Sequence, residues 1–192
     1  DRCNLRCTYC MPAEGLNWMP SDSFLSASEI IDLGQHFVAL GIEHIRLTGG
    51  EPTLRKDILD IVTGLATIPN LRDLSLTTNG LLLEKLASSL KQSGLQRLNI
   101  SIDSLQPERF SQMTRGGQLH KVLTGIDAAY AAGFGHTPQT PIKLNAVIIP
   151  DRNDDELMDF IEYAHQHPAY IEPRFIEYMP FGNRWHDSSN SA

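Results

Sequence analysis

The chain has 192 residues, of which 41% are hydrophobic and 20% are charged, and it carries a formal net charge of −7. This composition is typical of a soluble globular domain, and it excludes a membrane span because no run of about 18 apolar residues occurs. The sparse Lys and Arg residues argue against a nucleic-acid-binding surface. Because the sequence opens abruptly at Asp1, we expect the native protein to continue beyond both ends.

All three cysteines lie in the first ten residues, as Cys3, Cys7 and Cys10 with the spacing C-x3-C-x2-C. Three thiolates in one short loop are ligands for an iron-sulfur, copper(I) or zinc centre. Without a fourth thiol, a four-iron cluster held here has one iron open to a small molecule, which favours catalysis. The alternatives are three unrelated thiols or a zinc loop completed by a distant histidine, of which His36 is the nearest. Free thiols also indicate a reducing compartment, and we expect the cytoplasm.

After an irregular stretch to residue 24, helix and strand patterns alternate along the chain. Ser26 and Glu29 form a capping box, and apolar residues at near-helical spacing follow until Gly41, namely Ile30, Ile31, Phe37, Val38 and Leu40. Further helices are predicted over residues 54–65, 83–90, 107–113 and 120–132. A last helix, capped by residues 153–156, has a predicted buried face of Leu157, Phe160, Ile161 and Ala164.

Strands are predicted over residues 43–48, 74–78, 97–102, 142–149 and 170–179, the last of them broken near Pro173. Strands that alternate with helices predict an α/β fold with a parallel sheet and right-handed crossovers. We expect residues 1–182 to form one core and residues 183–192 to be a disordered or truncated tail. In barrels of such units the chemistry gathers at the carboxyl ends of the strands.

Two predicted strands end in residues that suit a ligand. Gly49-Gly50-Glu51-Pro52 follows the first strand, and its two glycines allow unusual backbone angles, so that N–H groups can approach a ligand. Ser101 and Asp103 end the third strand, where a hydroxyl suits a ribose or carboxylate partner. Alone, the first segment fits an ordinary turn equally well, and Ser101 fits a residue that only terminates a strand.

Three cations interrupt strands that are otherwise apolar, namely Arg46, Lys143 and Arg174. A cation in such a position is costly unless it faces a ligand or a carboxylate. From three different strands these side chains can converge on a polyanion, as guanidinium and ammonium groups do on phosphates. The alternative is an ion pair with a neighbouring strand.

The segment C-N-L-R-C-T-Y-C-M-P resembles the signature of radical S-adenosylmethionine (SAM) enzymes, with Tyr9 as the aromatic residue, and resembles most the GTP 3',8-cyclase family of molybdenum-cofactor biosynthesis. The resemblance implies a partial (β/α)6 TIM-like barrel whose first strand precedes Asp1. It also implies a [4Fe-4S] cluster on Cys3, Cys7 and Cys10, whose open iron chelates SAM. The implied reaction uses a 5'-deoxyadenosyl radical to convert GTP to (8S)-3',8-cyclo-7,8-dihydroguanosine 5'-triphosphate, a molybdopterin precursor.

The resemblance also implies roles for single residues and partners. For SAM it implies contacts from Tyr9 (through its backbone), Gly50, Glu51, Ser101 and Met179. For GTP it implies contacts from Arg46, Thr77, Lys143 and Arg174. An electron donor such as flavodoxin or ferredoxin is implied as a partner, and a homodimer is compatible with the family, whereas nucleic acid and membrane are not expected.

The chain departs from the family's pattern in two ways. Family members carry a second cluster on three carboxyl-terminal cysteines, but no cysteine follows Cys10 here, and the family's arginine upstream of the first cluster is absent. We therefore expect a radical SAM core from a longer enzyme, one that cleaves SAM weakly and does not complete GTP cyclisation. Two alternatives are another radical SAM enzyme, such as a peptide-modifying maturase, and a non-enzymatic zinc-binding module.

Overall fold

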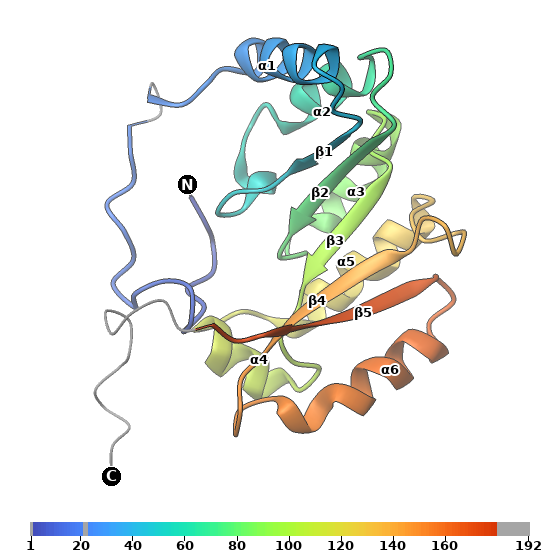
Figure 1. Cartoon of the computed structure of the whole chain (residues 1–192). Coiled ribbons are helices and arrows are strands. Elements are labelled where there is room, and N and C mark those ends of the chain that lie inside the picture. The colour runs from blue at the N-terminus through green and yellow to red at the C-terminus, as the bar shows by residue number, and fades with distance from the viewer. Residues whose placement is uncertain (1, 21–22, 180–192) are drawn as a thin grey trace.

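The fold is a five-stranded parallel sheet, seen in a computed structural model that describes residues 2–20 and 23–179 (Figure 1). The strands lie in the order in which they occur in the chain, and every neighbouring pair is parallel. They are β1 (His44–Leu47), β2 (Asp73–Thr78), β3 (Arg97–Ser101), β4 (Ile142–Ile148) and β5 (Ile171–Glu177).

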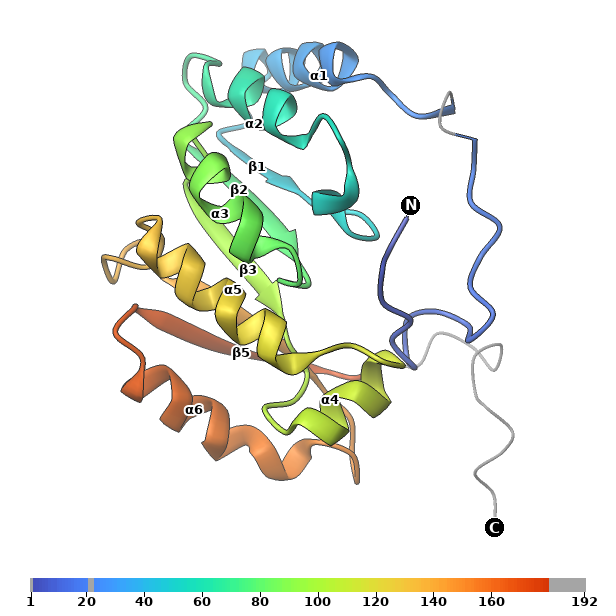
Figure 2. The same cartoon turned by 180° about the vertical axis from the view of Figure 1, so that it is seen from behind.

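Helices connect successive strands and cover one face of the sheet, as the view from behind shows (Figure 2). They are α1 (Ala27–Ala39), α2 (Ile58–Ala66), α3 (Leu83–Gln92), α4 (Pro107–Thr114), α5 (Leu119–Ala131) and α6 (Leu157–Gln166). Two short 3-10 segments, η2 (Pro52–Leu54) and η3 (Asp154–Glu156), precede α2 and α6. This alternation confirms the predicted α/β architecture.

The core lies between the helices and the outer face of the sheet. Residues of β2 and β3 that alternate along each strand, such as Leu76 and Leu98, are buried against the helices. Because successive side chains point to opposite faces, the other half of each strand lines the inner face. Those positions are polar, and the register aligns them across the sheet: Arg46, Ser75, Thr77, Arg97, Asn99, Ser101, Lys143, Asn145, Glu172 and Arg174. An inner face of this polarity provides a lining for a ligand.

The predicted first helix is confirmed, although its outer residues are not buried. Ser26 and Glu29 form the capping box, and the helix ends at Ala39 before Gly41, which has a φ of 95°. Phe37 and Leu40 are 45% and 83% exposed. The residue of α1 that is fully buried is Gly34, where α1 crosses α2 so closely that a Cβ atom would lie 2.4 Å from a methyl carbon of Leu65.

The segment after the first strand differs from its prediction. The structure has the 3-10 turn η2 and begins α2 only at Ile58, instead of forming one helix from residue 54. The Arg55 side chain bonds Asp57 at 2.6 Å in the link between them. This pairing holds the backbone in a turn ahead of the helix.

Three further predictions near the carboxyl end are corrected. β5 is not broken at Pro173, which pairs with Leu144 in a continuous ladder, because an edge strand can turn its missing N–H away from its neighbour. The Asn153 side chain makes no helix cap, and it bonds instead the main chain of Asp103 and Ile149, which lie just beyond β3 and β4. On α6 only Phe160 is fully buried, and Ile161 is 47% exposed because α6 covers the last strand of the sheet.

None of the helices in the described part of the chain has the length and apolar character that crossing a membrane requires. The predicted tail over residues 183–192 lies outside the described residues.

Candidate functional site

The amino-terminal segment with the three cysteines folds into a tight loop. The N–H groups of Cys10 and Met11 both donate to the carbonyl oxygen of Cys7, each at 3.0 Å, so the C-x2-C part forms a single turn. Leu5 and Met11 are buried, at 7% and 6% exposure, and anchor the loop on either side. The thiols of all three cysteines are free.

Main-chain hydrogen bonds attach this loop to the end of α4. The N–H of Thr8 donates to the carbonyl of Met113 at 2.8 Å, and that of Arg6 donates to Thr114 at 3.2 Å. The Arg115 guanidinium donates to the carbonyl oxygens of Arg6 and Met11 at 3.0 and 2.8 Å. The loop is therefore held along its length by residues about one hundred positions away in sequence.

The same loop also contacts the segments that follow the carboxyl ends of three strands. These ends are the arrowheads in Figure 1. Beyond β1, the N–H of Glu51 donates to the carbonyl of Arg2 at 2.7 Å. Beyond β2, the Asn79 amide donates to the side-chain oxygen of Asn4 at 2.7 Å. Beyond β3, Asp103 accepts a hydrogen bond from Tyr9 at 2.8 Å. These contacts place the three cysteines at the end of the sheet where ligands bind in such folds.

The three thiols lie close enough together for each to affect the protonation of its neighbours. Burial raises the pKa of Cys7 well above its ordinary value, and the charges of Asp103, Cys10 and Cys3 raise it further. The pKa of Cys10 is raised by burial, then by Cys3 and Asp103. Among residues 2–20 and 23–179, no three His, Cys, Asp or Glu side chains are arranged to hold a single metal ion. Three neighbouring thiols without a fourth fit a [4Fe-4S] cluster, in which each thiolate binds a different iron.

The Gly49-Gly50-Glu51-Pro52 segment borders a cavity of about 860 Å³ that Arg2 also lines. Neither glycine has a positive φ, so the expected unusual backbone angles are not found. A Cβ atom on Gly49 would meet nothing within 4 Å, so the space beside its backbone is empty of protein. The backbone of this segment is therefore open to a ligand.

The Glu51 side chain points away from solvent and is 4% exposed. One carboxylate oxygen accepts from the Thr53 N–H, the Thr53 hydroxyl and the Thr78 hydroxyl, and the other accepts from the Asn79 N–H at 2.7 Å. These four hydrogen bonds match the roughly four acceptor positions of a carboxylate. Glu51 thus joins the loops that follow β1 and β2.

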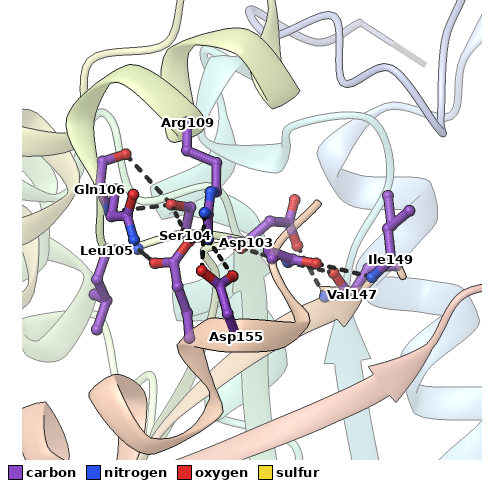
Figure 3. A network of polar contacts seen from close by, with 10 residues as sticks. Asp103, Ser104, Leu105, Gln106, Arg109, Val147, Ile149 and Asp155 are labelled. Carbon is purple, nitrogen blue, oxygen red and sulfur yellow. Dashed lines mark hydrogen bonds and ion pairs between the residues drawn. The ribbon is translucent and has the colours of Figure 1, made fainter. Parts of the chain in front are cut away.

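Asp103 is a buried carboxylate at the junction of β3 and β4, with 4% exposure. Burial raises its pKa, while hydrogen bonds from the Val147 N–H and from Tyr9 oppose that shift. Burial, followed by the charge of Asp103, raises the pKa of Tyr9, so the phenol keeps its proton and donates. Figure 3 shows Asp103 near Val147, beside the polar network of Ser104, Leu105, Gln106, Arg109 and Asp155.

That neighbouring network is organised by Glu156, which is fully buried. Its carboxylate accepts from the Ser104 hydroxyl and the Leu105 N–H, both at 2.7 Å, and from Arg109 at 2.6 Å. These bonds fix the segment after β3 against η3, and so fix the position of Asp103.

The three cations predicted from the sequence lie on one face of the sheet. Burial lowers the pKa of Lys143, and the positive charges of Arg174, Arg97 and Arg46 lower it further, in part opposed by Glu172. This mutual influence shows that the cations lie near one another. Neither contact of these cations is the alternative ion pair with a neighbouring strand, because Arg174 pairs at 2.7 Å with Glu172 of its own strand, and Arg46 donates at 3.4 Å to the neutral Ser75 hydroxyl of β2.

Two inner-face residues were missed by the sequence analysis. Arg97 forms an ion pair with Asp73, and both line a cavity of about 350 Å³ together with Arg46. Asn99 is 2% exposed, and its side-chain oxygen has no hydrogen-bond partner within the described structure. The sequence does carry a signal for Arg97, because its spacing of two from Asn99 and four from Ser101 puts all three residues on the same face of a strand.

The remaining predicted residues fall at different places. Thr77 pairs with Asn99 on the inner face, whereas the hydroxyl of Thr78 is used by Glu51. Ser101 ends β3 opposite Asn145 on the same face. Met179 follows β5 and is 64% exposed.

Comparison with known proteins decides the family. The family model described as the radical SAM superfamily matches residues 1–164. The chain belongs to the radical SAM superfamily. Membership assigns to it the cofactors of this superfamily, a [4Fe-4S] cluster and SAM.

Relatives in this superfamily are similar in sequence. The chain is 51% identical to a GTP 3',8-cyclase of Limosilactobacillus fermentum over 183 residues, which cover 95% of this chain and 53% of that protein. It is 46% identical over 187 residues to molybdenum cofactor biosynthesis protein 1 of Drosophila melanogaster, covering 97% of this chain and 32% of that protein. The chain thus spans about half the length, or less, of these curated relatives.

Solved structures share the fold. Methylornithine synthase (PylB) has a TM-score of 0.68 at 15% identity, covering 93% of this chain and 51% of that chain. Streptococcus suis SuiB bound to its precursor peptide SuiA has a TM-score of 0.67 at 18% identity, covering 92% and 37%. At these identities the likeness shows the radical SAM fold, in agreement with the predicted partial barrel.

Proposed function

We propose that this chain is the radical SAM core of a GTP 3',8-cyclase in molybdenum-cofactor biosynthesis. The observation that carries the proposal is the cationic inner face formed by Arg46, Arg97, Lys143 and Arg174, on the same sheet whose strand ends hold the cysteine loop. A triphosphate is an anion that such a face suits. The relatives named GTP 3',8-cyclase, at about 50% identity, support the same substrate.

On the cofactor side, Cys3, Cys7 and Cys10 would hold the cluster, which would supply the one-electron chemistry of SAM cleavage. Tyr9, Gly50, Ser101 and Met179 would contact SAM, and the backbone of Gly50 would bind its amino-acid end. Glu51 would support this segment through its bonds to Thr78 and Asn79, and its own contact with SAM stays a prediction.

On the substrate side, Arg46, Lys143 and Arg174 would bind the triphosphate together from three different strands. The Thr77 hydroxyl would donate a further hydrogen bond to GTP. The buried oxygen of Asn99, between Thr77 and Lys143 in the register, is placed to accept from a hydroxyl or N–H of the nucleoside. These residues orient GTP and displace water from the inner face, which strengthens each charged contact.

The proposal extends to partners and setting. A one-electron donor such as flavodoxin or ferredoxin must reduce the cluster, and free thiols with a reduced cluster require a reducing compartment, for which we propose the cytoplasm. A homodimer stays a prediction. Because relatives are about twice as long, we assign completion of cyclisation to the whole enzyme.

The test is a hydrogen-transfer experiment on the anaerobically reconstituted chain. SAM and dithionite are supplied with GTP deuterated at C3', and 5'-deoxyadenosine is analysed by mass spectrometry. We expect slow SAM cleavage, deuterium in the 5'-deoxyadenosine, and no cyclised product. Lys143→Ala should lower the deuterium transfer at least tenfold, whereas Arg72→Ala, which removes an exposed cation paired with Glu43, should not. SAM cleavage without any transfer from GTP would point to another substrate, as in the maturase alternative.

A further inference from the structure

One side-chain hydrogen bond connects the turn that contains Cys7 and Cys10 to a distant part of the chain. Tyr9 lies between Cys7 and Cys10, and its hydroxyl donates to a carboxylate oxygen of Asp103 at 2.8 Å. The two residues are 94 positions apart in sequence. Phenylalanine could fill the same space, so the hydroxyl adds a directed attachment that packing alone does not provide.

Asp103 is itself held rigidly. Its second carboxylate oxygen accepts from the Val147 N–H at 2.9 Å, and its main-chain oxygen accepts from the Asn153 amide at 2.6 Å. Asn153 in turn donates to the Val147 carbonyl and accepts from the Ile149 N–H, both at 2.8 Å. Figure 3 shows Asp103, Val147 and Ile149 gathered at this junction. A buried carboxylate with these partners is a fixed point at the ends of β3 and β4.

We propose that Asp103 and the Tyr9 hydroxyl are positioning residues that tether the cysteine loop to the sheet. The tether sets the place of Cys7 and Cys10 relative to Ser101, which precedes Asp103 by two residues at the end of β3. It therefore sets where the open iron meets the SAM-binding groups. This inference rests on the proposed use of the loop for a cluster, but the tether itself is a property of the chain without cofactor.

Substitutions at Asp103 can separate the effect of the hydrogen bond from the effect of the negative charge. In Asp103→Asn, the carbonyl oxygen can still accept from Val147, while the amide N–H can donate to the phenol oxygen, which accepts as well as donates. The geometry survives and the charge is lost. In Tyr9→Phe and Asp103→Ala the bond itself is lost.

The first experiment measures hydrogen exchange in the cofactor-free chain at the amides of Thr8, Cys10 and Met11. We expect Tyr9→Phe and Asp103→Ala to accelerate exchange about tenfold, as expected for the loss of one hydrogen bond. Asp103→Asn should stay within about twofold of the parent chain. Tyr163→Phe, which removes a phenol hydroxyl on α6, is the control and should change nothing at these amides.

The second experiment follows the reconstituted chain by iron and sulfide analysis and by the electron paramagnetic resonance of the reduced cluster during SAM titration. Tyr9→Phe should keep its iron content, because the three thiols are intact, but need about tenfold more SAM for the spectral change. Unchanged exchange in Tyr9→Phe, or an Asp103→Asn chain as impaired as Asp103→Ala, overturns the tether. If the parent chain assembles no cluster, the proposed function fails while the exchange experiment still decides the tether.

Discussion

At the scale of single residues, positive charges lie close together on the inner face of the sheet, and their repulsion is unfavourable. Lys143 shares this face with Arg46, Arg97 and Arg174, and burial together with these charges lowers its pKa. Such a cluster is unfavourable in the free chain and becomes favourable once an anion occupies it. A bound triphosphate should therefore raise the pKa of Lys143 toward its ordinary value.

This reasoning predicts a pH dependence of anion binding. Because Lys143 loses its proton at a lower pH in the free chain than in the complex, binding takes up a proton in the window between those two pKa values. Affinity for inorganic triphosphate should fall as pH rises through the lowered pKa. Calorimetry near that pH, in buffers of different ionisation enthalpy, measures the uptake. Lys143→Arg should abolish it, since arginine stays charged; equal uptake in that variant would assign the proton to another group.

The sequence revealed some of these residues and not others for physical reasons. Arg46, Lys143 and Arg174 were predictable because a cation in an apolar strand is costly. Asn99 was not, since a neutral amide gives no such signal and its lack of a partner exists only in the folded sheet. The bond from Tyr9 to Asp103 was equally hidden, because no local pattern relates the two positions.

At the scale of elements, close approach between helices depends on glycine. In α5, a Cβ atom on Gly125 would lie 2.6 Å from the backbone oxygen of Gly80, which itself has a φ of 79°. A backbone oxygen cannot move aside as the end of a side chain can. The lack of a side chain at Gly125 therefore allows α5 to pack closely against the start of α3.

We predict that Gly125→Ala destabilises the chain although alanine favours helices. The propensity gain is about 1 kcal/mol, whereas overpacking against fixed backbone costs about 1–3 kcal/mol. The net loss should appear as a lower denaturation midpoint in urea. Gly49→Ala, whose Cβ atom meets nothing within 4 Å, should leave the midpoint unchanged. A more stable Gly125→Ala chain would show that α5 can shift away from Gly80.

Element types were predictable from periodicity, but their partners were not. Asn153 resembles a helix cap in sequence. Its side-chain amide instead donates to the main-chain oxygen of Asp103, which lies 50 residues away at the junction of β3 and β4. Pro173 suggested a broken strand, and only the sheet order shows that β5 is an edge, where proline is tolerated. In both cases the deciding contact is distant in sequence.

At the scale of the whole molecule, the site is made by long-range attachment of one short loop. Residues 2–11 bond the end of α4 and the segments that follow β1, β2 and β3. The cationic inner face lies on the same sheet, so cofactor and substrate groups share one scaffold.

The most direct test of this account is anaerobic reconstitution of the chain with iron and sulfide, followed by addition of SAM. We predict about four irons and four sulfides per chain, and a resonance of the reduced cluster that changes when SAM is added. Cys7→Ala should lose this signal. Zinc without acid-labile sulfide, or a four-iron signal indifferent to Cys7→Ala, would contradict the assignment of the loop to the cluster.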